Sequence, residues 1–228
     1  RISQIKSILN QATKLGLNKY LTFKEYKVLK TKSKKEYLNK EEIQSLLELN
    51  LSENKRLEKV RDIFLVCCYT GVRFSEYKNL KKENIELGKE GKRINYFSKK
   101  TKKYVNTICD ENTFELLKKY KFNLPQISGQ KYNEYIKEVC QIAGIDNVIT
   151  VHTYKSGKAT TYQKQKFELI ASHTARRSFV TNLFKDNVTT SLIMVCTGHT
   201  KESTLSNYIQ TTAIESIDLI HQQLKKSG

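Results

Sequence analysis

Residues Thr197–Tyr208, with the sequence TGHTKESTLSNY, place a histidine nine residues ahead of a tyrosine. Gly198 permits a sharp turn after the apolar segment Leu192–Val195. The small polar residues that follow can cap a short helix, and the tyrosine falls in its second turn. The stretch therefore predicts an imidazole on a turn, His199, and a phenol on a neighbouring helix, Tyr208. Because the chain contains thirteen tyrosines, the meaning of this stretch depends on the residues upstream.

The balance of charge indicates a polyanionic partner. The 228 residues include 41 Lys and Arg but 23 Asp and Glu, which gives a net charge of +18. Such a surplus repels itself unless a polyanion shares it, so nucleic acid is the first candidate. An anionic membrane surface is the alternative, but no basic helix has the strong apolar face of an interfacial anchor. The sequence also shows no apolar run long enough for a membrane span and no signal-peptide pattern at its start.

Cysteine and glycine usage indicates the compartment and the fold class. Five cysteines without Cys-x-x-Cys spacing lie mostly beside apolar residues, where a free thiol behaves as a small hydrophobe. This pattern favours a reducing, intracellular compartment and argues against a zinc site. A hydrophobic content of 38% supports a core, and one proline with nine glycines favours a mainly helical protein. The cysteines are Cys67, Cys68, Cys109, Cys140 and Cys196.

Residues 1–33 are expected to be the end of a different domain and a linker. Apolar side chains in residues 2–15 share one helical face, which Gly16 ends. A short helix cannot bury such a stripe alone, and the chain does not begin with Met, so we expect a preceding N-terminal domain. The basic run Lys30–Lys35 has no apolar pattern and is typical of a linker. Residues 34–228 then form the main domain.

The main domain is predicted to be mainly α-helical with a small β component, an α+β fold. Apolar residues recur with helical spacing through most of it, and Asn39 ahead of two glutamates is a typical helix start. Short runs of β-type residues broken by Gly88 and Gly91 predict a three-stranded sheet, and Ser156-Gly157 predicts a separate hairpin. Helices are expected at about 40–50, 55–70, 111–121, 129–143, 173–186, 189–197, 203–210 and 213–226, with another from about Ser75. Strands are expected at 85–87, 93–97 and 104–109, and in the hairpin at 147–154 and 161–170.

Six residues from four short segments suit one chemical task. Two arginines, one lysine, two histidines and one tyrosine, without an acidic cluster to hold a metal, describe a site for a phosphodiester. Fixed cations stabilise the charge that a phosphoryl-transfer transition state gathers on its equatorial oxygens. A tyrosine phenolate can attack phosphorus and form a covalent phosphotyrosine, and a lysine can protonate the departing sugar oxygen. The six are Arg73, Lys100, His173, Arg176, His199 and Tyr208.

The order of these residues resembles the catalytic domain of tyrosine recombinases, the phage integrase family. The family pattern is Arg, Lys, His-x-x-Arg, His or Trp, and Tyr, and the six residues fit it in that order. The most specific parts are SHTARRSF at Ser172–Phe179, TGH at Thr197–His199 and the nine-residue step to the tyrosine. The resemblance covers about residues 34–228. Within the family, the chain is most similar to the integrases of Bacteroides-type mobile elements. Residues 1–30 resemble the end of the helical core-binding domain of that family.

The resemblance implies a site-specific recombinase that cuts and rejoins DNA strands for the integration or excision of a mobile element. Tyr208 would attack the scissile phosphate to give a 3′-phosphotyrosine and a free 5′-hydroxyl. Arg73 and Arg176 would hold the phosphate oxygens. Glu76, three residues after the first arginine, would orient these groups. No metal or nucleotide cofactor would take part.

The same resemblance implies proton-transfer and DNA-contact roles for the remaining residues. His173 would accept or share the tyrosine proton, and His199 would hydrogen-bond a non-bridging oxygen. Lys100 would be the general acid toward the 5′-oxygen, although the neighbouring lysines of the same hairpin are alternatives for that role. The residues expected to contact DNA are Lys99, Lys102 and Arg177.

Double-stranded DNA is the expected partner, bound by a homotetramer on paired sites, with no membrane and no small-molecule substrate. A C-terminal helix at 214–226 would dock onto a neighbouring protomer, and the protein is expected in the cytoplasm, associated with the nucleoid. Three positions depart from the family pattern. Tyr77 and Thr197 replace leucines, and Val105–Ile108 replaces a Val-Pro-Leu ending. These departures concern packing, so we expect activity to survive them.

Two other functions share part of this pattern. A type IB topoisomerase uses the same chemistry, but the linker features and larger size of that family are missing here. A DNA-binding module with decayed catalysis would keep the positive charge, but all six catalytic positions are filled. Strand exchange is therefore the expected function.

Overall fold

A computed structural model describes the fold for residues 2–26, 35–155 and 158–227. The elements fall into two units, one formed by residues 1–34 and 151–162 and the other by residues 35–150 and 163–228. The predicted linker Lys30–Lys35 lies outside the described residues, apart from Lys35. The domain boundary at residues 33–34 stays a prediction.

The smaller unit contains a helix whose apolar face is exposed. Helix α1 spans Ile2–Lys14 and has no buried residue. Gly16, with φ of +74°, follows it in the left-handed conformation that glycine adopts without strain. A single 3-10 turn, η1 at Thr22–Lys24, comes next, and Lys6 Nζ donates hydrogen bonds of 3.0 and 2.8 Å to two carbonyls near it. The helical pattern expected for this segment is confirmed.

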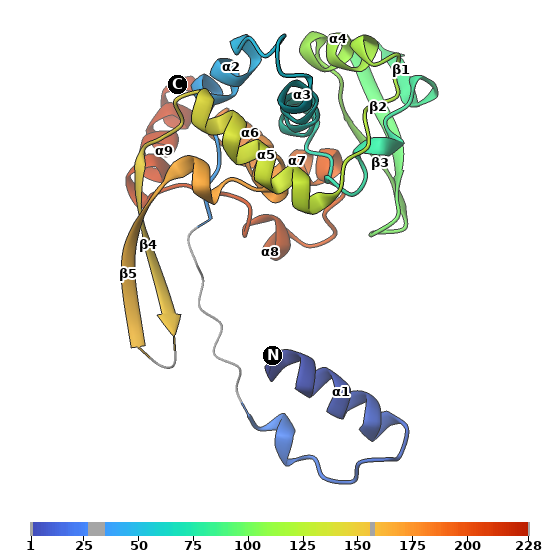
Figure 1. Ribbon diagram of the computed structural model, residues 1–228, viewed down its shortest axis with the longest axis vertical. Helices are drawn as coiled ribbons and strands as arrows, with labels where there is room; N and C mark the ends of the chain where they lie inside the picture. Colours follow the sequence, from blue (N-terminus) through green and yellow to red (C-terminus); the bar gives the residue numbers. More distant parts are fainter. Residues whose placement is uncertain (1, 27–34, 156–157, 228) are drawn as a thin grey trace. The chain divides into compact units, whose positions relative to one another are not determined.

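Helices make up most of the larger unit, which confirms the predicted fold class (Figure 1). Asn39 caps the first of them: its side chain accepts from the Glu42 N–H, and the Glu42 carboxylate accepts from the Asn39 N–H, both at 2.8 Å. No helix in the described part of the chain is long and apolar enough to cross a membrane. The helices are α2 (Lys40–Glu48), α3 (Lys55–Thr70), α4 (Glu111–Lys119), α5 (Gly129–Ile142), α6 (Ser172–Lys185), α7 (Thr190–Thr197), α8 (Glu202–Leu205) and α9 (Ala213–Ser227).

Helix α3 is the centre of the larger unit. Asn54 caps its start by accepting a hydrogen bond of 3.2 Å from the Leu57 N–H. Nearly all of its later residues are buried, because α2, α4, α5 and α6 pack around it (Figure 1). It ends at Gly71, which has φ of +66° and where a Cβ would collide with the Phe179 ring of α6. The end of α3 and α6 can therefore approach this closely only with glycine at the turn.

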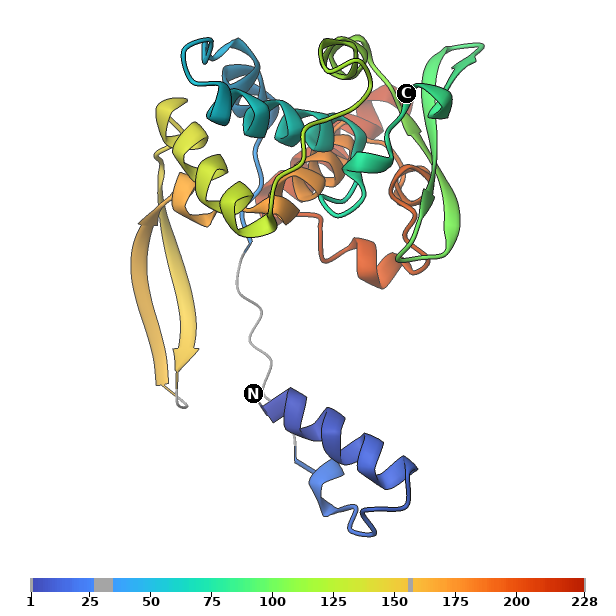
Figure 2. The same cartoon turned by 45° about the vertical axis from the view of Figure 1, so that its right-hand side comes forward.

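Three antiparallel strands form the sheet that the sequence predicts. They are β1 (Ile85–Gly88), β2 (Gly91–Ser98) and β3 (Lys103–Ile108), paired in that order. Every second residue at the end of β2 is buried, from Ile94 to Ser98, so this half of the strand has one face in the core. Helix α7 packs against β3, as the view in Figure 2 shows. The turn that follows α7 is therefore held next to the sheet.

The second predicted hairpin is present, and its two strands overlap the expected ranges. It consists of β4 (Val148–Lys155) and β5 (Lys158–Gln165), while its predicted turn, Ser156-Gly157, lies outside the described residues. A 3-10 turn, η4 at Lys166–Leu169, replaces the end of the second predicted strand. Here Glu168 Oε2 accepts from the Gln165 N–H at 2.9 Å, which holds the backbone in a turn.

The prediction of a helix from about Ser75 is wrong. The segment forms two separate 3-10 turns, η2 at Tyr77–Asn79 and η3 at Lys82–Asn84. Glu76 and Tyr77 are 3% and 0% exposed, and the Tyr77 hydroxyl donates to a backbone carbonyl, that of Pro125, at 2.7 Å. These two neighbouring buried side chains bind different parts of the core, and their contacts hold the segment in turns.

Helix α8 is shorter than the predicted helix at 203–210. The side chains of Ser206 and Asn207 donate hydrogen bonds of 3.0 and 2.7 Å to the carbonyl of Ser203. Such local side-chain bonds compete with helix propagation. Tyr208 therefore lies in the turn after α8 rather than inside a helix.

Candidate active site

The turn after α3 ties the first predicted arginine to the sheet. Arg73 is 7% exposed, and its Nη1 donates to Glu76 Oε2 at 3.1 Å and to Ser98 Oγ at 3.3 Å. Ser98 Oγ donates to Glu76 Oε1 at 2.7 Å, and the Lys100 N–H donates to the same oxygen at 3.4 Å. Glu76 thus pairs with Arg73 and also holds the start of the turn between β2 and β3.

Arg176 is held by the backbones of two glycine turns. It is 1% exposed, its Nη1 donates to the Gly71 carbonyl at 2.6 Å, and its Nη2 donates to the Thr197 carbonyl. The same Nη2 lies 3.5 Å from His199 Nε2. Burial, followed by the charge of Arg73, lowers the pKa of Arg176 to about 10. The Nε of Arg176 has no hydrogen-bond partner among the described residues.

His199 is neutral and closely packed. It follows the Gly198 turn, where a Cβ would stand 2.6 Å from Val105 Cγ2 of β3. The ring is 9% exposed, and its Nδ1 lies 2.8 Å from Thr197 Oγ1. Burial, then the charges of Arg176, Arg73 and Lys100, lowers the pKa of His199 to about 3. The imidazole is therefore uncharged at neutral pH.

Tyr208 is brought next to the second arginine and the second histidine. Its ring centroid lies 5.0 Å from that of His199 and 5.8 Å from Arg176 Cζ. Thr181 Oγ1 on α6 donates to the Tyr208 carbonyl at 3.0 Å, which fixes the backbone of the turn. The ring is half-buried and packs against a small apolar cluster formed by Phe179, Val180, Ile193 and Leu205.

His173 and Lys100 are solvent-exposed, unlike the two arginines. Partial loss of hydration, then the charges of Arg177, Lys100 and Arg176, lowers the pKa of His173. Lys100 contributes in the same way to the low pKa of His199. The lysine thus acts electrostatically on both histidines, although its side chain extends into solvent.

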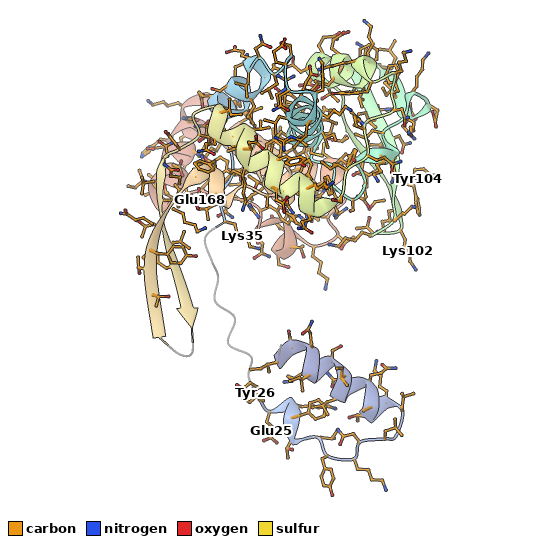
Figure 3. The ribbon with its side chains drawn as sticks, viewed as in Figure 1. Glu25, Tyr26, Lys35, Lys102, Tyr104 and Glu168 are labelled. Atoms are coloured by element: carbon orange, nitrogen blue, oxygen red, sulfur yellow. The ribbon has the colours of Figure 1, made fainter. Side chains whose placement is uncertain are left out.

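The other lysines of the β2–β3 turn are also exposed. Lys99 and Lys102 flank the general-acid candidate, and Lys102 has φ of +52°, an uncommon value outside glycine that fits a tight turn. Figure 3 shows Lys102 at the tip of this hairpin. Their ammonium groups are accessible to a polyanion.

Arg177 lies in a different environment from the one expected for a DNA contact. It is 7% exposed, and its Nη1 donates to the Glu36 carbonyl at 2.6 Å. Burial lowers the pKa of this guanidinium. Arg177 thus fastens the segment before α2 to α6. Its contact with DNA stays a prediction.

Charge distribution favours an anion at this site. Arg73 and Arg176 are both buried cations, one carboxylate, Glu76, lies with them, and His199 is neutral. The buried cluster therefore carries a net positive charge, to which the exposed Lys100 adds. Because the charge of Arg73 disfavours the charged form of Arg176, an anion bound beside the two guanidinium groups would relieve the repulsion.

Sequence reasoning missed three polar residues that position the site. Ser98 joins Glu76 to the hairpin turn, Thr197 contacts His199, and Thr181 holds the Tyr208 carbonyl. The alternation of β2 could have pointed to Ser98, since it shares the inward face with two buried residues. A threonine where leucine is usual was the available signal for Thr197.

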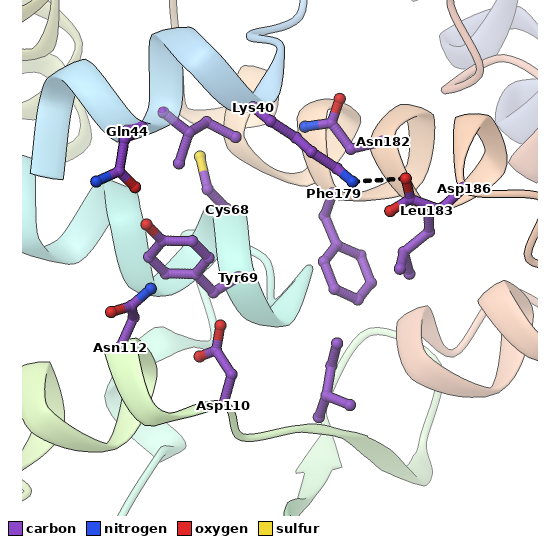
Figure 4. Close-up of a pocket in the computed structure, with 12 residues that line it drawn as sticks. Lys40, Gln44, Cys68, Tyr69, Asp110, Asn112, Phe179, Asn182, Leu183 and Asp186 are labelled. Carbon is purple, nitrogen blue, oxygen red and sulfur yellow. Dashed lines mark hydrogen bonds and ion pairs between the residues drawn. The ribbon is translucent and has the colours of Figure 1, made fainter.

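A separate cavity of about 330 Å³ opens between α2, α3 and α6 (Figure 4). Lys40 Nζ lies 2.5 Å from Asp186 Oδ1 beside it, and none of the predicted site residues lines it. Within the described residues, no group of three or more His, Cys, Asp and Glu side chains could hold a metal ion. Metal independence of the reaction stays a prediction.

Comparisons with known proteins identify the family. The model of the phage integrase family matches residues 36–214, which is most of the chain. A search of curated proteins finds no significant match.

Solved structures share the fold at low sequence identity. XerA recombinase matches with a TM-score of 0.59 and 18% identity, over 96% of this chain and 73% of that one. A lambda integrase dimer bound to a COC′ core site gives 0.64 and 14%, over 93% and 72%. The Tn1549 transposon integrase in complex with a circular intermediate DNA gives 0.62 and 13%, over 97% and 77%. The chain belongs to the phage integrase family and has the fold of a tyrosine recombinase catalytic domain.

Proposed function

We propose that this chain carries the active site of a site-specific DNA recombinase that cuts and rejoins strands through a 3′-phosphotyrosine. The observation that supports this most directly is the position of Tyr208, whose ring stands 5.8 Å from Arg176 Cζ and 5.0 Å from the His199 ring. A nucleophile, a buried cation and an imidazole ring, from α6 and from the turns after α7 and α8, thus lie side by side. Family membership favours the same reaction.

In the proposed first step, the Tyr208 oxygen attacks the scissile phosphorus and the bond to the 5′-oxygen breaks. Arg73 and Arg176 bind the non-bridging oxygens, on which the transition state gathers negative charge. Their hydrogen bonds to Glu76 and to backbone carbonyls fix them before the DNA arrives. Because the two guanidinium groups are already fixed, they need little rearrangement when the phosphate binds.

Proton transfer would involve the first histidine and the hairpin lysine, while the second histidine would bind the phosphate. His173 accepts or shares the phenol proton, and His199 hydrogen-bonds a non-bridging oxygen. Lys100 donates a proton to the leaving 5′-oxygen. The reverse steps, with a different 5′-hydroxyl as the attacking group, rejoin the strands. No metal takes part in this scheme, since fixed cations supply the positive charge.

Duplex DNA is the proposed substrate and partner. The net charge of +18 favours a polyanion, and Lys99 and Lys102 are exposed at the hairpin tip, where they can bind phosphates. One structural neighbour is a complex of an integrase with circular intermediate DNA. We extend the proposal to integration or excision of a mobile element of the Bacteroides type, by a homotetramer on paired sites. The substrate would place the protein with the nucleoid in the cytoplasm.

Covalent trapping tests the proposal without knowledge of the target sequence. A library of nicked duplexes with random sequence is incubated with the protein, and DNA that stays attached in denaturing detergent is recovered. The nick lets the cleaved fragment diffuse away, so the phosphotyrosine cannot religate. Enrichment of one sequence by the wild type but not by Tyr208→Phe is expected. Equal recovery with both proteins, or none with either, would contradict the proposed function.

A further inference from the structure

Thr197 connects the end of α7 to the ring of His199 by a short chain of hydrogen bonds. The hydroxyl Oγ1 lies 2.6 Å from the Ile193 carbonyl, one turn earlier in the helix, and 2.8 Å from His199 Nδ1. Thr197 is 0% exposed, so no solvent competes for these bonds. The carbonyl of the same residue accepts from Arg176 Nη2. One residue therefore contacts both groups that face Tyr208.

The distances determine where the protons lie. A carbonyl oxygen can only accept, so the Thr197 hydroxyl donates to Ile193, because two oxygens 2.6 Å apart without a proton between them would repel. The hydroxyl oxygen then accepts from His199, which puts the ring proton on Nδ1. Nε2 keeps its lone pair and faces Arg176 Nη2 at 3.5 Å.

The neutral imidazole ring of His199 carries a single N–H proton. The groups that act on it are Arg176 from α6, Arg73 from the turn after α3 and Lys100 from the hairpin, with the Tyr208 ring beside it. Burial and the three cations lower the pKa of His199 to about 3. Protonating both nitrogens at neutral pH is therefore unfavourable, and a neutral ring must choose between them.

The unliganded arrangement does not suit a bound phosphate. An anionic oxygen next to Nε2 needs a donor, but Nε2 is an acceptor in this state. The Thr197 hydroxyl offers a solution, since rotation about its C–O bond redirects its proton from the Ile193 carbonyl to Nδ1. This rotation becomes possible once Nδ1 has lost its own proton to solvent and Nε2 has gained one from solvent. The Ile193 carbonyl keeps the backbone bond of the helix, and Oγ1 moves away from it beyond the 2.6 Å of the free protein, because no proton then lies between the two oxygens.

We propose that the Thr197 hydroxyl is a positioning group that selects the tautomer of His199, with Nδ1–H in the free protein and Nε2–H when an anion occupies the site. The role of this switch in catalysis rests on the proposed function, in which the bound anion is the scissile phosphate. The atoms balance: the neutral ring carries one proton in each state, and so does the hydroxyl. A leucine at this position would leave Nδ1 without a partner.

Nitrogen-15 NMR of histidine-labelled protein at pH 7.5 tests the switch, with His199→Gln used to assign the signals. The free wild type should show a protonated Nδ1 and an unprotonated Nε2. Saturating inorganic phosphate, added at constant ionic strength, should exchange the two. Thr197→Val should lose the Nδ1–H preference, and Thr197→Ser, which keeps the hydroxyl, should retain the wild-type pattern.

Several results would overturn the inference. These are an Nε2–H tautomer in the free wild type, an unchanged tautomer in Thr197→Val, and no exchange at phosphate concentrations up to 100 mM, whether or not phosphate binds. Thermal unfolding of Thr197→Val and Thr197→Ser shows whether each variant is folded. If Thr197→Val is unfolded, the phosphate titration of the wild type and of Thr197→Ser still decides the outcome.

Covalent trapping separates this inference from the proposed function. With a nicked duplex recovered from the library, Thr197→Val should form the adduct about 10-fold more slowly than the wild type, since a buried ring nitrogen loses its partner. Thr197→Ser should be close to wild type. If Thr197→Val forms the adduct as fast as the wild type and its His199 tautomer is unchanged, the inference is wrong but the recombinase function stands. If phosphate still exchanges the two tautomers of His199 but no adduct forms, the proposed function is wrong and the anion-dependent switch stands.

Discussion

At the scale of single residues, Glu76 accepts hydrogen bonds from three groups of the site. The partners are Arg73 Nη1, Ser98 Oγ and the Lys100 N–H, and the carboxylate is 3% exposed. Removing one member of a buried ion pair leaves the other charge without compensation. Glu76 is therefore predicted to matter for folding as well as for the geometry of the arginine.

Glu76→Gln should lower the free energy of unfolding by about 3 kcal/mol, because Arg73 stays buried without its counter-charge. Urea denaturation at pH 7.5 measures this loss. The matched control is Glu86→Gln, which removes an exposed ion pair with Arg93 at 2.7 Å and should cost under about 1 kcal/mol. Equal losses in the two variants would contradict the assigned role of Glu76.

His199 makes stability depend on pH in a defined direction. Its pKa is about 3 in the folded protein against an ordinary value of 6.5, so the unfolded chain binds the proton first as the pH falls. The free energy of unfolding should therefore decrease between pH 6.5 and 3, by up to about 1.4 kcal/mol per pH unit from this group. Urea denaturation at several pH values should give a shallower decrease for His199→Gln. His221→Gln, on the exposed face of α9, controls for the loss of one histidine. A slope that is identical in the wild type and His199→Gln would contradict the burial argument.

At the scale of elements, two glycine turns bring the site together. Gly71 ends α3 against α6, and Gly198 ends α7 against β3, each with positive φ. Both turns also lie beside carbonyls that accept from Arg176. The same close approaches that pack the helices therefore hold the guanidinium.

Gly71→Ala should be much more destabilising than Gly144→Ala. Both glycines have positive φ, +66° and +73°, so both substitutions strain the backbone by about 1 kcal/mol. A Cβ at Gly144 has open space, whereas one at Gly71 collides with the Phe179 ring, which adds about 2 kcal/mol or more. Urea denaturation of the two variants checks the difference. Similar losses would show that α3 and α6 are not packed as described.

Periodicity and turn residues were enough to predict most elements. Helix α3 and the strands β1 to β3 lie within a few residues of their expected bounds, since apolar spacing and flanking glycines dominate there. The helix from Ser75 was wrong because Glu76 makes tertiary contacts with Arg73 and Ser98 that no local pattern shows.

The site shows the same division between local and tertiary information. The spacing of His199 and Tyr208 predicted two groups that the structure places 5.0 Å apart, measured between ring centroids. Arg177 was expected at the DNA, yet it donates to the Glu36 carbonyl from a buried position. Adjacent arginines in a helix look alike in the sequence, and only packing determines which of them reaches the site.

At the scale of the whole molecule, the net charge of +18 dominates the expected interaction with DNA. Each phosphate that the protein binds releases counterions, so affinity falls with salt. The exposed lysines at the hairpin tip are the part of this charge that the structure places near the proposed site.

Lys102→Ala should weaken binding to a random-sequence duplex and reduce the slope of log affinity against log salt by about 0.9, the value for one lost phosphate contact. Fluorescence anisotropy at several NaCl concentrations, from about 50 to about 200 mM, measures this slope. Lys118→Ala, on α4 and paired with Glu115 at 3.1 Å, is the control and should leave the slope unchanged. The same loss of slope in both variants would mean that the hairpin tip has no special part in binding.

The central claim is that the Tyr208 oxygen becomes esterified to phosphorus, and peptide mapping of the trapped adduct tests it most directly. Trypsin should release the peptide Glu202–Lys225, in which Tyr208 is the single tyrosine. Mass spectrometry after nuclease digestion should find a nucleotide on this tyrosine. A nucleotide on another peptide, or an adduct that forms equally well with Tyr208→Phe, would contradict the account.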